Sequence, residues 1–128
     1  LLIESGSLTS IEYMSNSKPI PRAKPDIAMA HVLAAQYLGM KLVYLDAGSG
    51  GIQPVPFEMI EACAGYVDIP LIVGGGIHTG EHAEQAVRAG ASFIVVGNAL
   101  EKTHGSTLLA ELATAVHEAS RGDVRSDG

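Results

Sequence analysis

Asp46-Ala47-Gly48-Ser49-Gly50-Gly51, Gly74-Gly75-Gly76-Ile77 and Gly97-Asn98 are three glycine-rich turns, and each of them follows a short apolar stretch. Glycine accepts positive φ and has no Cβ, so successive backbone N–H groups in such turns can point at one anion. Two such turns on consecutive parallel strands, the second opening a short helix, are typical of the phosphate site of a (β/α)₈ barrel. The sequence therefore predicts a phosphate-binding α/β protein.

Predicted strands and helices alternate along the chain. The strands are expected at residues 1–4, 41–46, 71–73 and 92–96, and the helices at 26–38, 56–66, 80–89 and from Ser106 onward. Nearly continuous apolar strands suit a parallel sheet covered by helices. These four βα units are half of a full barrel, which needs about 250 residues. We therefore expect one domain over residues 1–122, the C-terminal half of a (β/α)₈ TIM barrel with a phosphate site at the C-terminal ends of its last two strands. A frayed polar tail is expected over 123–128.

The half-barrel has two interpretations, and both stay open at this point. The sequence opens with Leu1-Leu2-Ile3, which has the pattern of the middle of a buried strand. This opening favours four further βα units ahead of Leu1 in the native protein. Alternatively, a true half-barrel pairs with a second copy, because an open four-stranded sheet would expose two edges.

Charge and cysteine content exclude several classes of partner and site. The 128 residues carry a net charge of −6, with 8 Lys+Arg against 14 Asp+Glu, so no basic stripe is available for nucleic acid. Cys63 is the only cysteine, which excludes an intramolecular disulfide and points to a reducing cytoplasm. No apolar run is long enough to span a bilayer. His78 and His82 lie four residues apart without a third ligand nearby, so we expect no metal site.

Four ordered segments together carry a family resemblance. They are Tyr44-Leu45-Asp46-Ala47-Gly48-Ser49-Gly50, Val73-Gly74-Gly75-Gly76-Ile77, Val96-Gly97-Asn98-Ala99-Leu100-Glu101 and the loop Lys18–Asp26. Over residues 1–102 the chain resembles the geranylgeranylglyceryl phosphate synthase family. A single glycine-rich loop would be weak support, whereas four segments at barrel spacing are specific.

The resemblance implies a prenyltransferase of membrane ether-lipid biosynthesis. In that reaction the C3 hydroxyl of sn-glycerol 1-phosphate attacks geranylgeranyl diphosphate, forming an ether bond and releasing pyrophosphate with the help of Mg²⁺. The family's metal-binding acidic residue lies on the first strand of the barrel, which this sequence lacks. We therefore expect the chain to hold the glycerol-phosphate site but no metal ligand, and to be inactive alone. Homo-oligomers and peripheral membrane contact through the lipid substrate are further implications.

Tyr44 and Asp46 are the predicted functional side chains of the segment Tyr44–Gly50. They lie two residues apart on one strand and so face the same side, opposite Val43 and Leu45. If that side is the barrel interior, Asp46 can take the proton of the glycerol hydroxyl. Asp46 is therefore the predicted catalytic residue. Many family members carry Glu at this position, and the shorter Asp leaves two roles open, direct base or glycerol ligand.

The remaining predicted site residues are backbone ligands and turn residues. By the resemblance, the substrate-binding set is Tyr44, Leu45, Asp46, Ala47, Gly48, Ser49, Gly50, Gly75, Gly76, Gly97 and Asn98. Backbone N–H groups of the last four are expected to hold the phosphate, because donors at a helix N-terminus suit an oxyanion. The Ser49 hydroxyl is an additional donor over the glycerol.

Two further questions stay open in the sequence. Lys18, Arg22 and Lys24 lie in a polar loop over residues 6–24, which is either a lid over an anionic substrate or a solvated charged segment. Alternative functions are another phosphate-binding barrel enzyme, such as an isomerase or synthase, and a non-catalytic phosphate-binding half-barrel. The length of the prenyl chain is not determined by these residues.

Overall fold

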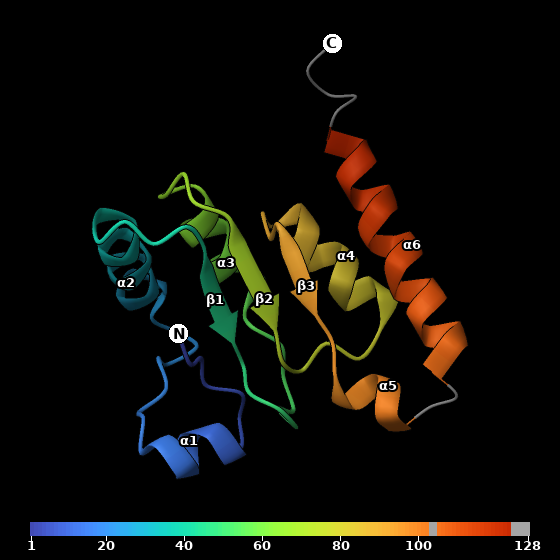
Figure 1. Cartoon of the computed structure of the whole chain (residues 1–128), viewed down its shortest axis with the longest axis horizontal. Coiled ribbons are helices and arrows are strands. Elements are labelled where there is room, and N and C mark those ends of the chain that lie inside the picture. Colours follow the sequence, from blue (N-terminus) through green and yellow to red (C-terminus); the bar gives the residue numbers. More distant parts are fainter. Residues whose placement is uncertain (103–104, 124–128) are drawn as a thin grey trace.

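Three parallel strands form the centre of the protein. The computed structural model describes residues 1–102 and 105–123. In chain order its elements are α1 (Ser10–Ser15), α2 (Pro25–Tyr37), β1 (Val43–Asp46), α3 (Phe57–Ala64), β2 (Leu71–Gly74), α4 (Gly80–Arg88), β3 (Phe93–Val95), α5 (Asn98–Lys102) and α6 (Gly105–Asp123) (Figure 1). The sheet order is β1-β2-β3. The predicted α/β fold with a parallel sheet is therefore confirmed.

The pairing register places matching residues of the three strands side by side. Tyr44 pairs with Ile72, which in turn pairs with Phe93. One layer further along, Asp46 pairs with Gly74, which pairs with Val95. Paired residues in a parallel sheet share one face, so both layers lie on the same side of the sheet.

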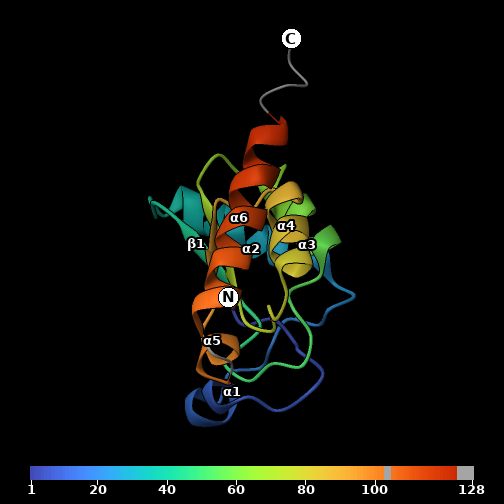
Figure 2. The same cartoon turned by 90° about the vertical axis from the view of Figure 1, so that its right-hand side faces the viewer.

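The helices cover the other face of this sheet. Helices α3 and α4 lie along one side of the sheet, and α2 packs next to α3 (Figures 1 and 2). The fully buried strand residues Leu45, Leu71 and Val73 point to that side. On the opposite face Phe93 is 57% exposed and Val95 44% exposed. Parallel sheets are ordinarily covered on both faces, and within residues 1–102 and 105–123 only one face has helices on it.

The predicted first strand, residues 1–4, is reduced to two isolated parallel bridges. Leu2 bridges to Asp46 of β1, and Ile3 bridges to Ile20. The Ile3 N–H donates to the Asp46 carbonyl at 2.8 Å, while the Ile20 N–H donates to the Leu2 carbonyl at 2.9 Å. Gly6, at φ +84°, turns the chain away soon afterwards. The segment therefore lies beside β1 as expected, but it is too short to form a ladder.

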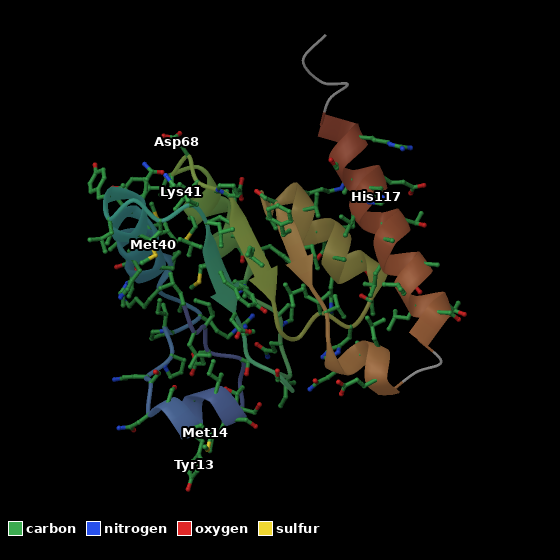
Figure 3. The ribbon with its side chains drawn as sticks, in the orientation of Figure 1. Tyr13, Met14, Met40, Lys41, Asp68 and His117 are labelled. Carbon is green, nitrogen blue, oxygen red and sulfur yellow. The ribbon has the colours of Figure 1, made fainter. Side chains whose placement is uncertain are left out.

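The predicted loop over residues 6–24 contains a helix that the sequence reading missed. The Thr9 side chain accepts a hydrogen bond from the Glu12 N–H at the start of α1. Helix α1 buries none of its residues, and Tyr13 and Met14 project from it away from the sheet (Figure 3). The expectation of a continuous loop was wrong because local capping, rather than core packing, makes this helix.

Other boundaries agree closely with expectation. Thr79 caps α4 by accepting from the His82 N–H at 3.2 Å, and Pro25 begins α2. The last helix begins at Gly105, one residue before the expected cap, and Asp123 is its final residue. The other residues of the expected tail, 124–128, lie outside the described residues. None of the described helices combines the length and the apolar character that crossing a membrane requires.

Cys63 is expected to be chemically inert in the folded protein. It is fully buried in α3, and this burial raises the pKa of its thiol to about 11. Because the thiolate is the reactive form, only about one molecule in a thousand would carry it at pH 8. We expect a disulfide reagent to modify Cys63 at least about a hundredfold faster in urea than in buffer. Equal rates in the two solutions would contradict this burial.

Candidate functional site

The predicted glycine-rich turns converge on one cavity at the C-terminal ends of the strands. The cavity has a volume of about 110 Å³. It is lined by Tyr44, Asp46, Gly48, Ser49, Gly50, Gly75, Gly76, Ile77, His78, Val95, Val96, Gly97, Asn98 and Ala99. Chemistry in α/β folds with parallel strands is placed at this end of the sheet.

Tyr44 and Asp46 reach the cavity because β1 alternates its side chains. Val43 and Leu45 are buried on the helix-covered side, while Tyr44 and Asp46 are only half-buried and line the cavity. The Tyr44 hydroxyl lies against the α-carbon of Gly74, where a Cβ would collide with it. Glycine at position 74 therefore makes room for the tyrosine within the sheet.

The two carboxylate oxygens of Asp46 have different surroundings. Oδ1 accepts a hydrogen bond from the Gly48 N–H at 2.7 Å, which holds the start of the first glycine-rich turn. Oδ2 has no hydrogen-bond partner among the described residues, and Asp46 lines the cavity. One oxygen thus shapes the loop, and the other is available to a bound hydroxyl group.

The Tyr44 hydroxyl is a neutral donor beside this carboxylate. Burial raises the pKa of Tyr44 above its ordinary value, and the negative charge of Asp46 raises it further. A raised pKa keeps the proton on the phenol throughout the neutral range. Tyr44 can therefore donate a hydrogen bond to an anionic ligand.

Gly75 and Gly76 are required by the packing of the chain itself. Their φ angles are +80° and +68°, in the left-handed region that favours glycine. A Cβ on Gly75 would lie 2.7 Å from the Gly48 nitrogen, which belongs to the neighbouring turn. A Cβ on Gly76 would overlap the backbone of Gln53 and Pro54. This turn is thus wedged between two stretches of main chain.

Gly97 differs from these glycines because no contact among the described residues requires it. Its φ lies outside the left-handed region, and apart from Gly97 and its two chain neighbours no described atom lies within 4 Å of where its Cβ would be. Gly97 nevertheless lines the cavity directly before α5. A ligand that approaches the backbone at this point would account for the missing side chain.

Nine of the eleven predicted site residues line the cavity, and two do not. Leu45 and Ala47 are fully buried and contribute no surface to it. The sequence reading missed five lining residues, namely Ile77, His78, Val95, Val96 and Ala99. His78 follows the second glycine-rich turn directly, and that adjacency was the available signal. The other four are apolar and could not be distinguished from core residues.

Charged side chains contribute little to the cavity wall. Among the described residues that line the cavity, Asp46 is the only carboxylate, and Lys18, Arg22 and Lys24 do not belong to this set. The described residues contain no group of three or more His, Cys, Asp or Glu side chains that could hold a metal ion. One carboxylate with an oxygen already bound does not make a magnesium site, because Mg²⁺ requires octahedral oxygen ligation. The arrangement instead favours an anion held by backbone N–H groups.

A family model and the curated relatives point to the same protein family. The PcrB family model matches residues 1–116. Geranylgeranylglyceryl phosphate synthase of Thermococcus gammatolerans is 58% identical over 102 residues, which cover 80% of this chain and 40% of the relative. The synthase of Spirosoma linguale is 45% identical over 126 residues, covering 98% of this chain and 50% of the relative.

A solved structure is also similar. The crystal structure of (S)-3-O-geranylgeranylglyceryl phosphate synthase from Thermoplasma acidophilum in complex with substrate sn-glycerol-1-phosphate superposes with a TM-score of 0.87 at 34% identity. The superposition covers 92% of this chain and 47% of that one. The chain therefore spans half or less of the length of the relatives it matches. The resemblance inferred from the sequence is confirmed, and the chain belongs to the PcrB family.

Proposed function

We propose that this chain is the glycerol-phosphate-binding part of a prenyltransferase that makes geranylgeranylglyceryl phosphate. One observation carries the proposal. Two glycine-rich turns, one of which contains a glycine that the fold does not need, meet an unpartnered carboxylate oxygen in a single cavity. The turns offer donors to a phosphate, and the carboxylate offers an acceptor to an alcohol. A glycerol phosphate has both groups.

The proposed architecture is the C-terminal half of a (β/α)₈ barrel. The uncovered face of the sheet carries Tyr44, Ile72 and Phe93 in one layer and Asp46 and Val95 in the next. Layers of inward-facing side chains fill the interior of such barrels. The aligned region makes up 40% and 50% of the length of the two relatives, which supports a second half that would cover this face.

The proposed chemistry is an alkylation of an alcohol. The C3 oxygen of sn-glycerol 1-phosphate forms a bond to C1 of geranylgeranyl diphosphate, and the bond from C1 to the diphosphate oxygen breaks. Asp46 Oδ2 receives the proton of the hydroxyl, and pyrophosphate leaves. Gly75, Gly76, Gly97 and Asn98 hold the glycerol phosphate so that this hydroxyl faces the prenyl carbon. The ligands of Mg²⁺ are proposed to lie in the other half of the barrel.

Partners and location follow from the same proposal. The substrates are a phosphorylated triol and a prenyl diphosphate, and the second of these brings the enzyme into peripheral contact with a membrane. We further propose a cytoplasmic location, in line with the unpaired cysteine, and a homo-oligomer, as the family resemblance implies. Nucleic acid is not a proposed partner at a net charge of −6.

Binding to the isolated chain tests the glycerol-phosphate site. Calorimetric titration with sn-glycerol 1-phosphate is expected to saturate at one site. Its mirror image, sn-glycerol 3-phosphate, is expected to bind more weakly because it cannot present its phosphate and both of its hydroxyl groups in the same arrangement. Absence of saturable binding would overturn the proposal. Prenyl transfer is expected from a fusion that places the first part of the Thermococcus gammatolerans relative ahead of Leu1, but not from the chain alone. The intact relative is the positive control.

A substitution at Gly97 locates the anion within the cavity. Gly97→Val is expected to weaken binding of inorganic phosphate at least about tenfold, because the new side chain occupies the space left open beside the turn. Stability in urea is expected to change little, since no described atom beyond residue 97 and its two chain neighbours lies within 4 Å of the new Cβ. Unaltered phosphate affinity in a folded Gly97→Val variant would show that Gly97 only shapes a turn.

A further inference from the structure

Arg22 has contacts that neither a lid nor a solvated loop explains. Its Nη1 donates to the Pro54 carbonyl at 2.7 Å and to the Glu4 carbonyl at 3.1 Å. Its backbone N–H donates to the Glu4 carboxylate at 3.3 Å. The side chain is thus directed at the main chain of two other segments, and it does not line the cavity. Hydrogen bonds from a charged guanidinium are stronger than neutral ones.

The Pro54 carbonyl belongs to the segment that packs behind the phosphate-binding turn. The α-carbon of Gly76 lies so close to the Gln53–Pro54 peptide that a Cβ would overlap it. The Gln53 N–H donates to the Ser5 carbonyl at 3.2 Å, which holds the residue before Pro54. Proline also restricts the backbone here, because its ring fixes φ. Gln53 and Pro54 are therefore held on one side by Ser5 and on the other by Arg22, which bonds the Pro54 carbonyl.

We propose that Arg22 is a positioning residue for the Gly75–Gly76 turn. It acts through Pro54 and does not contact the ligand. By fixing the position of the Gln53–Pro54 peptide, it determines the direction of the N–H groups of the turn. Lys18 and Lys24 are the natural comparison, because they are exposed cations of the same loop and no described hydrogen bond links their side chains to Pro54. The proposal rests on the proposed phosphate site, whereas the contacts that link Arg22 to Pro54, and the Gln53–Pro54 peptide to Gly76, do not depend on it.

The test compares Arg22 with its two neighbouring cations in ¹⁵N-labelled chain titrated with inorganic phosphate. R22M is expected to displace the amide resonances of Gly75 and Gly76 before any ligand is added. It is also expected to weaken phosphate binding by roughly 10–100-fold, the cost of donors misplaced by about 1 Å. R22K should recover part of both effects, because lysine supplies one donor to the Pro54 carbonyl. K18M and K24M should leave both readouts unchanged.

The outcomes separate this inference from the proposed function. Urea unfolding first shows that each variant is folded under the conditions of the titration. A loss of phosphate binding then cannot result from unfolding of the variant. Unmoved Gly75 and Gly76 resonances in R22M would overturn the positioning role. Equal weakening by K18M or K24M would also overturn it, in favour of a cationic lid. If the parent chain binds no phosphate while R22M still displaces these resonances, the proposed function fails and the positioning contact stands.

Discussion

Gly76→Ala is expected to lower the free energy of unfolding by about 2–5 kcal/mol. Two costs add in this substitution. A non-glycine residue in the left-handed region costs about 1–2 kcal/mol, and Gly76 lies there at φ +68°. The new Cβ would also overlap the Gln53–Pro54 peptide, and overpacking of this kind costs about 1–3 kcal/mol. The turn that we propose to bind phosphate would be displaced at the same time.

Two other glycines are matched controls for the separate costs. Gly39 has φ +81° but no atom within 4 Å of its Cβ position, so Gly39→Ala isolates the backbone strain. Gly97 has neither a left-handed φ nor a close contact, so Gly97→Ala should be nearly neutral. Urea unfolding of the three variants is expected to rank them in the order 76, 39, 97. Equal losses of unfolding free energy in Gly76→Ala and Gly39→Ala would show that the Gln53–Pro54 peptide moves away from the new Cβ without cost.

Asp46→Asn is expected to have the largest effect on function. The amide oxygen can still accept from the Gly48 N–H, which Asp46 Oδ1 does at 2.7 Å, so the loop should stay in place. The variant loses a charged acceptor for the glycerol hydroxyl, and such hydrogen bonds are worth about 1.5–3 kcal/mol. Affinity for sn-glycerol 1-phosphate should fall by about 10–150-fold. Turnover of the fusion enzyme should fall by about 100–10,000-fold if Asp46 is the base.

Inorganic phosphate provides the internal reference for this variant. It has no glycerol hydroxyl, so its affinity should be unchanged or stronger once the nearby negative charge is removed. The ratio of the two affinities therefore reports on Asp46 alone. Asp68→Asn makes the same change in charge at the opposite end of the sheet from α1 (Figure 3) and should leave the ratio unaltered. A ratio unchanged in Asp46→Asn would remove Asp46 from recognition of the hydroxyl.

The sequence predicted the elements that pack and missed one that does not. Helix α4 could be predicted from its cap Thr79 and its buried small residues Ala83 and Ala86. Helix α1 has no buried residue, so its sequence has no apolar periodicity from which a helix could be predicted. The signal that could have revealed it is Thr9 followed by Glu12, which has the spacing of a capping box. The strand expected at residues 1–4 is only two isolated bridges for another reason. The length of a ladder depends on where the chain turns away, which here happens at Gly6.

For the site, the sequence predicted which residues meet at the cavity, while their roles in binding stay predictions. The positive φ of Gly75 and the alternation that exposes Asp46 both follow from local rules. The contacts of the Arg22 side chain could not be predicted, because its acceptors are the backbone carbonyls of Glu4 and Pro54, which are distant in sequence. Backbone acceptors carry no residue-specific signal. The same limit applies to Gly97, whose open surroundings appear only in three dimensions.

The wedged Gly75–Gly76 turn has a consequence for the kinetics of ligand capture. Main-chain contacts with Gly48, Ala47 and Gln53 already immobilise it, so its conformational entropy is lost during folding and not when an anion arrives. Few rotatable bonds of the turn remain to be fixed when a ligand binds. Association with a small phosphate should therefore be limited by diffusion rather than by loop rearrangement. Differences in affinity among phosphorylated ligands should consequently appear in their dissociation rates.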